Sequence, residues 1–126
     1  MNAEICREFS FDAAHLLPHH SGKCSKLHGH TYRIRFYVAG PVKRIEGSSD
    51  EGMVLDFGLL SQAYKEHLEP LLDHRYLNES LQISAPTAEL VAAWALTRMS
   101  SLMPGISRVR VYETPTAYAE VWKEGS

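Results

Sequence analysis

The chain has 126 residues, of which 44% are hydrophobic and 22% are charged. This size and balance are typical of one globular domain with a single modest core, so we expect residues 1–126 to form one domain. The formal net charge of −2 at pH 7, without any basic block, gives no reason to expect a nucleic-acid partner or an anionic membrane surface.

The sequence contains no run of about 18 apolar residues that would span a bilayer. Its first residues, Met1 to Arg7, lack the apolar core of a signal peptide. We therefore expect a cytoplasmic protein. Cysteines in that compartment are mostly reduced, so Cys6 and Cys24 are expected to be free thiols.

Residues 4–15 alternate between apolar and polar positions, which predicts a half-buried strand. The apolar face of this strand ends at His15. A polar connection over residues 16–26 follows and contains Pro18 and Gly22. It is too long for a tight hairpin, and we interpret it as an active-site loop.

Residues 28–39 predict a second strand whose even-numbered positions form the more apolar face. Side chains two residues apart on a strand point to the same side, so His28 and His30 share that face. If the two strands pair antiparallel, the end of the first lies beside the beginning of the second. We therefore expect His15, His28 and His30 to converge.

Gly40 and Pro41 end the second strand, and a polar loop leads to a short strand predicted over residues 53–55. Apolar residues at helical spacing predict a helix from Phe57 to about Leu71.

A second helix is predicted from near Pro86 and Thr87 to just before Pro104. Residues 108–113 and 117–122 predict two further strands. This order of elements predicts an α+β fold, with a four-stranded antiparallel sheet and two helices packed on one of its faces.

The three histidines suggest zinc, because three neutral imidazoles fill three tetrahedral positions and leave the fourth open, as in catalytic zinc sites. A closed structural site with Cys24 as the fourth ligand is an alternative. In a third reading the histidines are ordinary polar residues of a loop and strand ends.

Cys24 lies in the loop with Lys23 and Lys26 on either side, and their charges would lower the pKa of its thiol. This favours a general base or nucleophile beside the metal, with a loop cysteine of no chemical role as the alternative.

Two acidic residues have positions that suggest a function. Asp73 precedes His74 in a segment expected to be irregular, and a carboxylate can hold an imidazole in one tautomer. A surface turn would carry the same pair without any function. Glu113 ends an apolar strand face, where a carboxylate either reaches solvent or is held by partners, because its burial alone is costly.

Six motifs lie along nearly the whole chain, at residues 11–15 (FDAAH), 24–30 (CSKLHGH), 54–57 (VLDF), 72–78 (LDHRYLN), 86–89 (PTAE) and 113–116 (ETPT). In this order they resemble the motifs of the 6-pyruvoyltetrahydropterin synthase family. The short Cys-x-x-x-His-Gly-His spacing resembles the branch of that family that forms 6-carboxytetrahydropterin in queuosine and 7-deazapurine biosynthesis.

The resemblance implies a tunnelling fold, in which subunits join edge to edge into a β-barrel, commonly as a homohexamer with active sites between subunits. It implies a zinc ion on His15, His28 and His30, which agrees with the ligand set expected from strand parity.

The resemblance also implies roles for other residues. Cys24 would be the proton-abstracting thiolate, with Asp73 and His74 as its acid–base partners. Glu113 would anchor the pterin and Thr87 would help to hold it. The sequence departs from the family pattern at Ala88, where relatives often have Thr or Ser, and at Arg75, which replaces a common His or Lys.

The implied substrate is 7,8-dihydroneopterin triphosphate, which would give 6-carboxy-5,6,7,8-tetrahydropterin, acetaldehyde and triphosphate. Lys23, Lys26, Arg33 and Arg75 are candidates for binding the triphosphate. Two alternatives are a 6-pyruvoyltetrahydropterin synthase, which eliminates triphosphate without carbon–carbon cleavage, and a zinc-stabilised pterin-binding module without activity.

Overall fold

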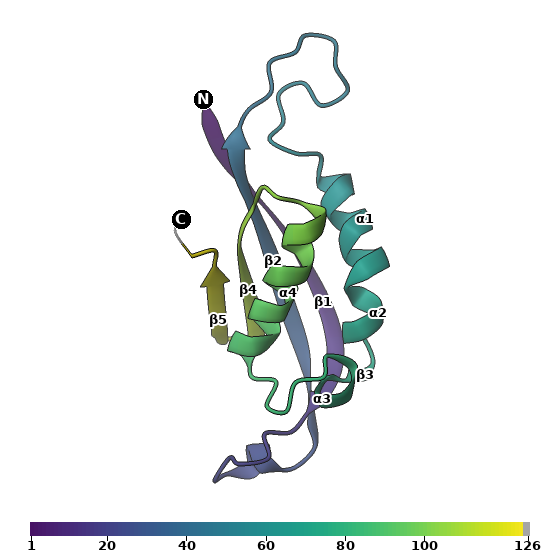
Figure 1. Cartoon of the computed structure of the whole chain (residues 1–126), viewed down its shortest axis with the longest axis vertical. Coiled ribbons are helices and arrows are strands. Elements are labelled where there is room, and N and C mark those ends of the chain that lie inside the picture. Colours follow the sequence, from purple (N-terminus) through teal and green to yellow (C-terminus); the bar gives the residue numbers. More distant parts are fainter. Residues whose placement is uncertain (125–126) are drawn as a thin grey trace.

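The computed structural model describes residues 1–124. In this range five strands form one sheet, in the order β3-β1-β2-β4-β5 (Figure 1). The strands are β1 (Asn2–His15), β2 (His28–Pro41), β3 (Arg75–Tyr76), β4 (Ile106–Thr114) and β5 (Ala117–Trp122). The helices are the 3-10 turn η1 (Lys23–Ser25), α1 (Phe57–His67), α2 (Glu69–Leu72), α3 (Leu77–Ser80) and α4 (Ala88–Leu102).

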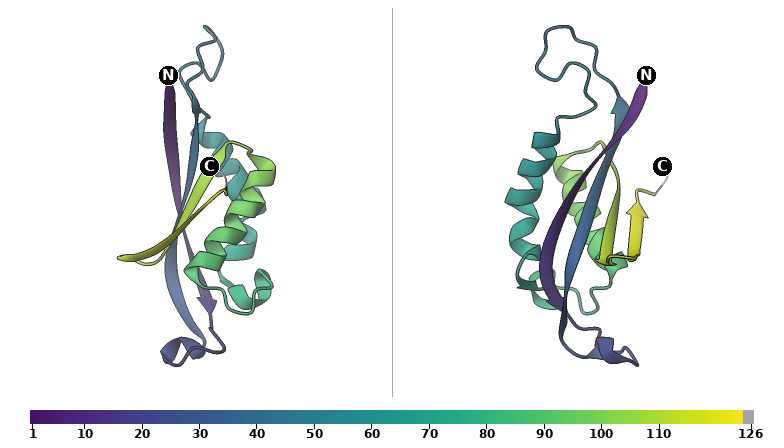
Figure 2. Two further views of the ribbon diagram at one scale, coloured as in Figure 1. Left: turned by 60° about the vertical axis from the view of Figure 1, so that its left-hand side comes forward. Right: turned by 180° about the vertical axis from the view of Figure 1, so that it is seen from behind.

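The predicted α+β class is confirmed, because the four long strands pair antiparallel and the two long helices lie on one face of the sheet (Figure 2). The structure adds a fifth, two-residue strand, β3, which pairs parallel to β1 and makes the sheet mixed. It also adds the two one-turn helices α2 and α3.

Strands β1 and β2 form a long antiparallel hairpin, as the sequence predicts. In its register Phe11 lies opposite Tyr32, and His15 lies opposite His28. The alternation of side chains sends the odd-numbered residues of β1 and the even-numbered residues of β2 toward the helices over the half nearest His15. The imidazoles therefore extend the same face that carries the core.

The core lies between that face of the sheet and the helices α1 and α4. Its fully buried side chains include Tyr32, Ile34 and Phe36 from β2, Val109 and Val111 from β4, Leu60 and Tyr64 from α1, and Val91, Ala95 and Met99 from α4. Burying an aliphatic or aromatic side chain of this size contributes about 1.5–3 kcal/mol relative to leaving it exposed. This packing supports the hairpin end that carries the histidines.

A side-chain oxygen caps the N-terminus of each of the two long helices, α1 and α4. Asp56 Oδ1 accepts a hydrogen bond from the Gly58 N–H at 2.8 Å, and Thr87 Oγ1 accepts one from the Leu90 N–H at 3.2 Å. These oxygens satisfy N–H groups that have no partner inside the helix. The helix α4 therefore begins where the sequence predicts.

One predicted boundary and one predicted irregular segment are wrong. The first helix ends at His67 and not near Leu71, because Pro70 has no N–H and the chain turns at Leu68 into the separate short helix α2. The segment predicted to be irregular after it contains α2, β3 and α3.

The strand predicted over residues 53–55 is also absent from the described structure. Met53 O accepts a hydrogen bond from Lys43 N at 2.9 Å, and this contact closes the loop between β2 and α1. Val54 and Leu55 pack against the core without joining a strand ladder. The apolar character of this run therefore reflects loop packing and not sheet pairing.

None of the helices within residues 1–124 is long and apolar enough to cross a membrane. Both cysteines are free, as expected: Cys6 is exposed on β1, and Cys24 is partly buried in η1.

Candidate metal centre and acid–base residues

The structure brings together His15, His28 and His30, as strand parity predicts. Their ring centroids lie 4.6 Å apart for His15 and His28, 5.1 Å for His15 and His30, and 4.9 Å for His28 and His30. His15 is fully buried, whereas the other two rings are partly exposed. The cluster is therefore buried at His15 and partly open to solvent at His28 and His30.

Backbone carbonyls fix the tautomers of two of these rings. His15 Nδ1 lies 2.9 Å from Pro86 O, and His28 Nδ1 lies 2.6 Å from Lys26 O. A carbonyl oxygen only accepts, so each Nδ1 carries a proton and donates it. In the neutral rings each Nε2 then keeps its lone pair, which is how metal-binding histidines are usually oriented.

Glu113, at the end of β4, completes the cluster. Its Oε1 lies 3.2 Å from His15 Nε2 and 3.1 Å from His30 Nε2. The three histidines and Glu113 thus offer four possible ligand atoms that all lie within 4.8 Å of one another. This group can hold a metal ion.

This arrangement shifts the pKa values of Glu113 and His15. The hydrogen bond with His15 holds the pKa of Glu113 below its usual range. Burial acts to lower the pKa of His15, but the hydrogen bonds to Glu113 and Pro86 O outweigh burial and raise it. A proton on His15 Nε2 is thus one way to satisfy the Glu113 carboxylate, and a divalent cation at the same place is another.

The spacing of the nitrogens fits zinc. His15 Nε2 and His28 Nε2 are 3.0 Å apart. Two nitrogens bound to tetrahedral zinc at the usual bond length would be about 3.3 Å apart. His30 Nε2 is buried and has no hydrogen-bond partner among residues 1–124, since the nearby Glu113 oxygen is not aligned with the ring N–H direction. A buried ring nitrogen without a partner, facing other ligand atoms, is what a metal site requires.

Cys24 does not belong to this group of ligand atoms in the described part of the chain. Its backbone carbonyl accepts a hydrogen bond from Leu17 N at 2.7 Å, which closes the loop between β1 and β2. Lys23 and Lys26 are exposed in the same loop. Among residues 1–124 the possible ligand atoms of this cluster therefore come from three histidines and Glu113, and not from one cysteine and three histidines.

Asp73 and His74 lie along the outer edge of β1. The backbone of Asp12 binds both: Asp12 N donates to Asp73 Oδ1 at 3.0 Å, and His74 N donates to Asp12 O at 2.6 Å. His74 Nδ1 lies 3.0 Å from Asp73 Oδ2, so the carboxylate is placed to pair with the imidazole. The Asp12 N–H holds the pKa of Asp73 below its usual range.

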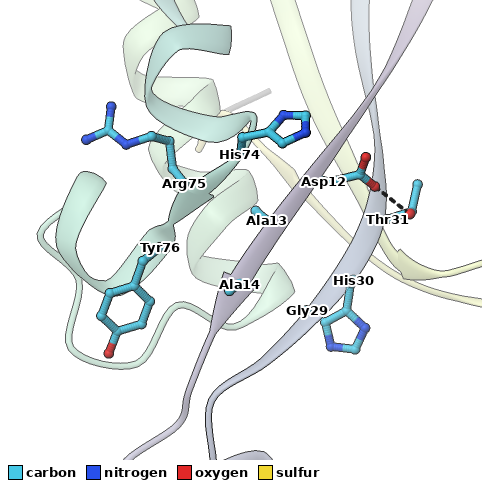
Figure 3. A pocket seen from close by; sticks show the side chains of 9 residues that line it. All are labelled: Asp12, Ala13, Ala14, Gly29, His30, Thr31, His74, Arg75 and Tyr76. Atoms are coloured by element: carbon cyan, nitrogen blue, oxygen red, sulfur yellow. Dashed lines mark hydrogen bonds between the residues drawn. The ribbon is translucent and has the colours of Figure 1, made fainter.

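His74 and His30 line the same open pocket, which has a volume of about 610 Å³ (Figure 3). Asp12 and Thr31 also line it, and a hydrogen bond joins their side chains. The strand β1 runs between the two imidazoles in this view, so they do not touch each other (Figure 3). Residues of the metal-ligand cluster and of the Asp73–His74 pair therefore border one pocket.

A second pocket of about 420 Å³ lies between the start of α4 and the strands β4 and β5. Glu113, Ala88 and Tyr118 line it. Glu113 therefore borders both the histidine cluster and this pocket. Thr87 precedes the pocket residue Ala88, and its hydroxyl caps α4.

The two arginine candidates for a phosphate are already engaged. The Arg33 guanidinium lies 3.9 Å from the centre of the Tyr112 ring and 3.2 Å from Glu8 Oε1. Arg75 donates to Pro70 O at 2.8 Å, although it also lines the larger pocket.

Sequence reasoning missed three groups in this region. The carbonyls of Lys26 and Pro86 are backbone atoms, for which no residue type gives a signal. Asn78, whose amide binds the backbone next to His15, falls inside the 72–78 motif but has no chemistry that separates it from a turn residue.

Comparisons with known proteins agree with this geometry. A 6-carboxy-5,6,7,8-tetrahydropterin synthase of Synechocystis is 49% identical over 91% of this chain and 89% of its own length. A dihydroneopterin monophosphate aldolase of Pyrococcus furiosus is 33% identical over 90% of this chain and 91% of its own.

Among solved structures, the 6-pyruvoyl tetrahydropterin synthase of Caenorhabditis elegans superimposes with a TM-score of 0.86 at 25% identity, over 98% of this chain and 97% of that one. The family model of 6-pyruvoyl tetrahydropterin synthase matches residues 4–124. The chain belongs to the 6-pyruvoyl tetrahydropterin synthase family.

Proposed function

We propose that this chain is a zinc-dependent 6-carboxytetrahydropterin synthase of queuosine biosynthesis. It would convert 7,8-dihydroneopterin triphosphate and one water molecule into 6-carboxy-5,6,7,8-tetrahydropterin, acetaldehyde and triphosphate. The observation that carries the proposal is the cluster of His15, His28 and His30, whose Nε2 atoms face one centre beside a pocket that also reaches His74. The 49% identical relative of that name supports the choice of reaction.

His15, His28 and His30 would hold the zinc ion. Zinc supplies Lewis acidity, which would acidify a side-chain hydroxyl of the pterin and the neighbouring C–H groups. The carbonyls of Pro86 and Lys26 already fix the rings of His15 and His28, so these two ligands need little reorganisation.

Proton transfer would belong to Cys24 and to the pair of Asp73 and His74. The thiol lies in η1, in the loop that joins β1 to β2 and leads into His28. Asp73 holds the His74 ring through Nδ1, which leaves Nε2 free to take up or give a proton. Two proton-transfer groups are needed, because the substrate must lose protons from carbon and oxygen while its leaving groups gain them.

Glu113 would orient the pterin. A carboxylate accepts two parallel N–H bonds from the guanidine-like edge of a pterin, and Glu113 borders a pocket large enough for the ring. Thr87 would help at the same place, while Lys23 and Lys26 would meet the triphosphate.

We propose a homo-oligomer, with a hexamer of edge-joined subunits as the expected form, acting in the cytoplasm as a single domain. Its support in the chain is the exposed edge strand β5, where Trp122 is 63% exposed and Tyr118 52% exposed. An exposed strand edge offers unpaired backbone groups to a neighbouring subunit.

Two other activities compete with this one. A 6-pyruvoyltetrahydropterin synthase would use the same groups and stop after triphosphate loss, and the Caenorhabditis elegans structure carries that name. An aldolase acting on a phosphorylated dihydroneopterin is the other, because a 33% identical relative is named for it. A pterin-binding module is the non-enzymatic alternative.

Product analysis after incubation with 7,8-dihydroneopterin triphosphate separates these functions. Acetaldehyde together with a carboxypterin is the expected result. Triphosphate without acetaldehyde would identify the pyruvoyl enzyme, a two-carbon aldehyde that still carries the triphosphate ester would identify the aldolase, and unchanged substrate would leave the binding module. His15→Ala, which removes one ligand, is the matched inactive control.

A further inference from the structure

Asn78 in α3 has an amide whose polar groups are all in use. Its Oδ1 accepts a hydrogen bond from Leu16 N at 3.0 Å. Its Nδ2 donates to Leu16 O at 2.8 Å and to Ser84 O at 3.0 Å. The amide thus meets three backbone groups, with both of its protons and one of the two lone pairs of Oδ1.

These contacts hold the backbone immediately after His15. The strand β3 pairs with Ala13 and Ala14 and then ends. Beyond it, the Asn78 amide binds both the N–H and the C=O of Leu16, as a neighbouring strand would. The short helix α3 lies beside this end of β1 (Figure 1). The edge of β1 is therefore kept in place on both sides of His15.

The same amide also holds the segment that fixes the His15 ring. Ser84 O accepts from Asn78, and two residues later Pro86 O accepts from His15 Nδ1 at 2.9 Å. Proline restricts the backbone at position 86, so the position of Ser84 influences where that carbonyl points. Asn78 thus connects the backbone that carries His15 with the carbonyl that sets its tautomer.

We propose that Asn78 is a positioning residue for the metal centre, acting through His15 and not by touching the metal. The inference rests on the metal centre of the proposed function. Partners that orient a metal-binding histidine from outside the ligand set commonly change metal affinity by about 10–100-fold when they are removed.

Ser80 provides a matched control in the same helix. It is partly buried, like Asn78, and its Oγ donates to Leu71 O at 2.7 Å. Among residues 1–124, no hydrogen bond joins Leu71 to His15, His28 or His30. Ser80→Ala therefore removes a similar side-chain-to-backbone bond from α3 without loosening His15.

The test measures zinc affinity of the full chain by competition with a chromophoric chelator, and the visible spectrum of the Co²⁺-loaded protein. Asn78→Ala should weaken zinc binding about 10–100-fold and alter the Co²⁺ spectrum, whereas Ser80→Ala should leave both unchanged. Asn78→Asp keeps the acceptor for Leu16 N but places a carboxylate against two carbonyls, so it should also weaken zinc binding. Melting temperatures of the chelator-treated proteins show the loss of folding stability separately.

Zinc affinity unchanged in Asn78→Ala, or reduced equally in Ser80→Ala, would overturn the proposal. Failure of both Asn78 variants to fold without metal would also overturn it, because a positioning role requires a folded chain. A parent protein that binds zinc but yields no acetaldehyde would overturn the proposed reaction alone, and a parent that binds no zinc would overturn the metal centre itself.

Discussion

Glu113 Oε1 lies 3.1 Å from His30 Nε2, yet the two atoms are not aligned as a hydrogen bond, and His30 Nε2 has no other partner within residues 1–124. The carboxylate therefore faces His30 without satisfying its ring nitrogen. Two roles are compatible with this position: a fourth ligand, or an anchor for the pterin at the edge of the metal site.

Replacing Glu113 separates these two roles. We expect Glu113→Ala to keep one zinc per chain and to weaken pterin binding about tenfold or more, because hydrogen bonds to a charged group are lost. Calorimetric titration with dihydroneopterin and metal analysis of the same sample measure both. Glu89→Ala is the control, since Glu89 lines the same pocket but is not part of the cluster. Loss of zinc in Glu113→Ala would make Glu113 a ligand.

Cys24→Ala should abolish turnover while zinc content stays near one per chain. The reason is that the thiol lies outside the group of ligand atoms, so its removal takes away a proton acceptor and leaves the metal ligands intact. Steady-state assays and metal analysis provide the measurement. Cys6→Ala, at the exposed cysteine on β1, should retain full activity. If Cys24→Ala lost its zinc, the closed four-ligand site would be correct.

Asp73 should titrate below the ordinary aspartate pKa of about 3.9, because its carboxylate accepts the Asp12 N–H and pairs with His74. A pKa that is lowered in the folded state contributes stability above the unfolded pKa. That stability is lost as the pH falls from about 4 through the lower folded pKa. A carbon-13 NMR titration of the side-chain carboxyl measures this directly, and a pKa at or above 3.9 would contradict the geometry.

A companion experiment follows unfolding against pH in Asp73→Asn. The amide retains an acceptor for Asp12 N but has no charge to lose. The free energy of unfolding of this variant should therefore fall less steeply below pH 4 than that of the parent. Parallel curves for the two proteins would show that Asp73 has no part in the acid response.

Thr87→Ala should lower the free energy of unfolding by about 1 kcal/mol, because the first turn of α4 loses the oxygen that accepts from Leu90 N. Thr87→Ser retains that oxygen and should recover most of the loss. Denaturant titrations of the three proteins give the comparison. Equal stability of the alanine and serine variants would show that the cap contributes nothing measurable.

The long elements could be predicted because their side-chain patterns repeat many times. Residues 4–15 and 28–39 alternate over enough positions to define strands, and the hairpin then determines which residues face each other. Since His15, His28 and His30 share one parity, their convergence follows from the register alone. The capping residues Asp56 and Thr87 likewise mark the helix starts.

The remaining features depend on contacts that have no pattern in the sequence. The strand β3 has two residues and exists through its pairing with β1 beside the Asp12 and His74 backbone bond. Met53 to Leu55 read as a strand because they are apolar, but the chain there packs as a loop. The carbonyls of Pro86 and Lys26, which set the imidazole tautomers, are supplied by the fold and not by residue type.

The most direct test of the account is a zinc titration of the chelator-treated chain, with acetaldehyde released from 7,8-dihydroneopterin triphosphate measured at each point. If the three histidines form the catalytic metal centre, acetaldehyde formation should rise in proportion to bound zinc and reach its plateau near one zinc per chain. Acetaldehyde formation at full rate without zinc, or a zinc-saturated chain that releases none, would contradict it.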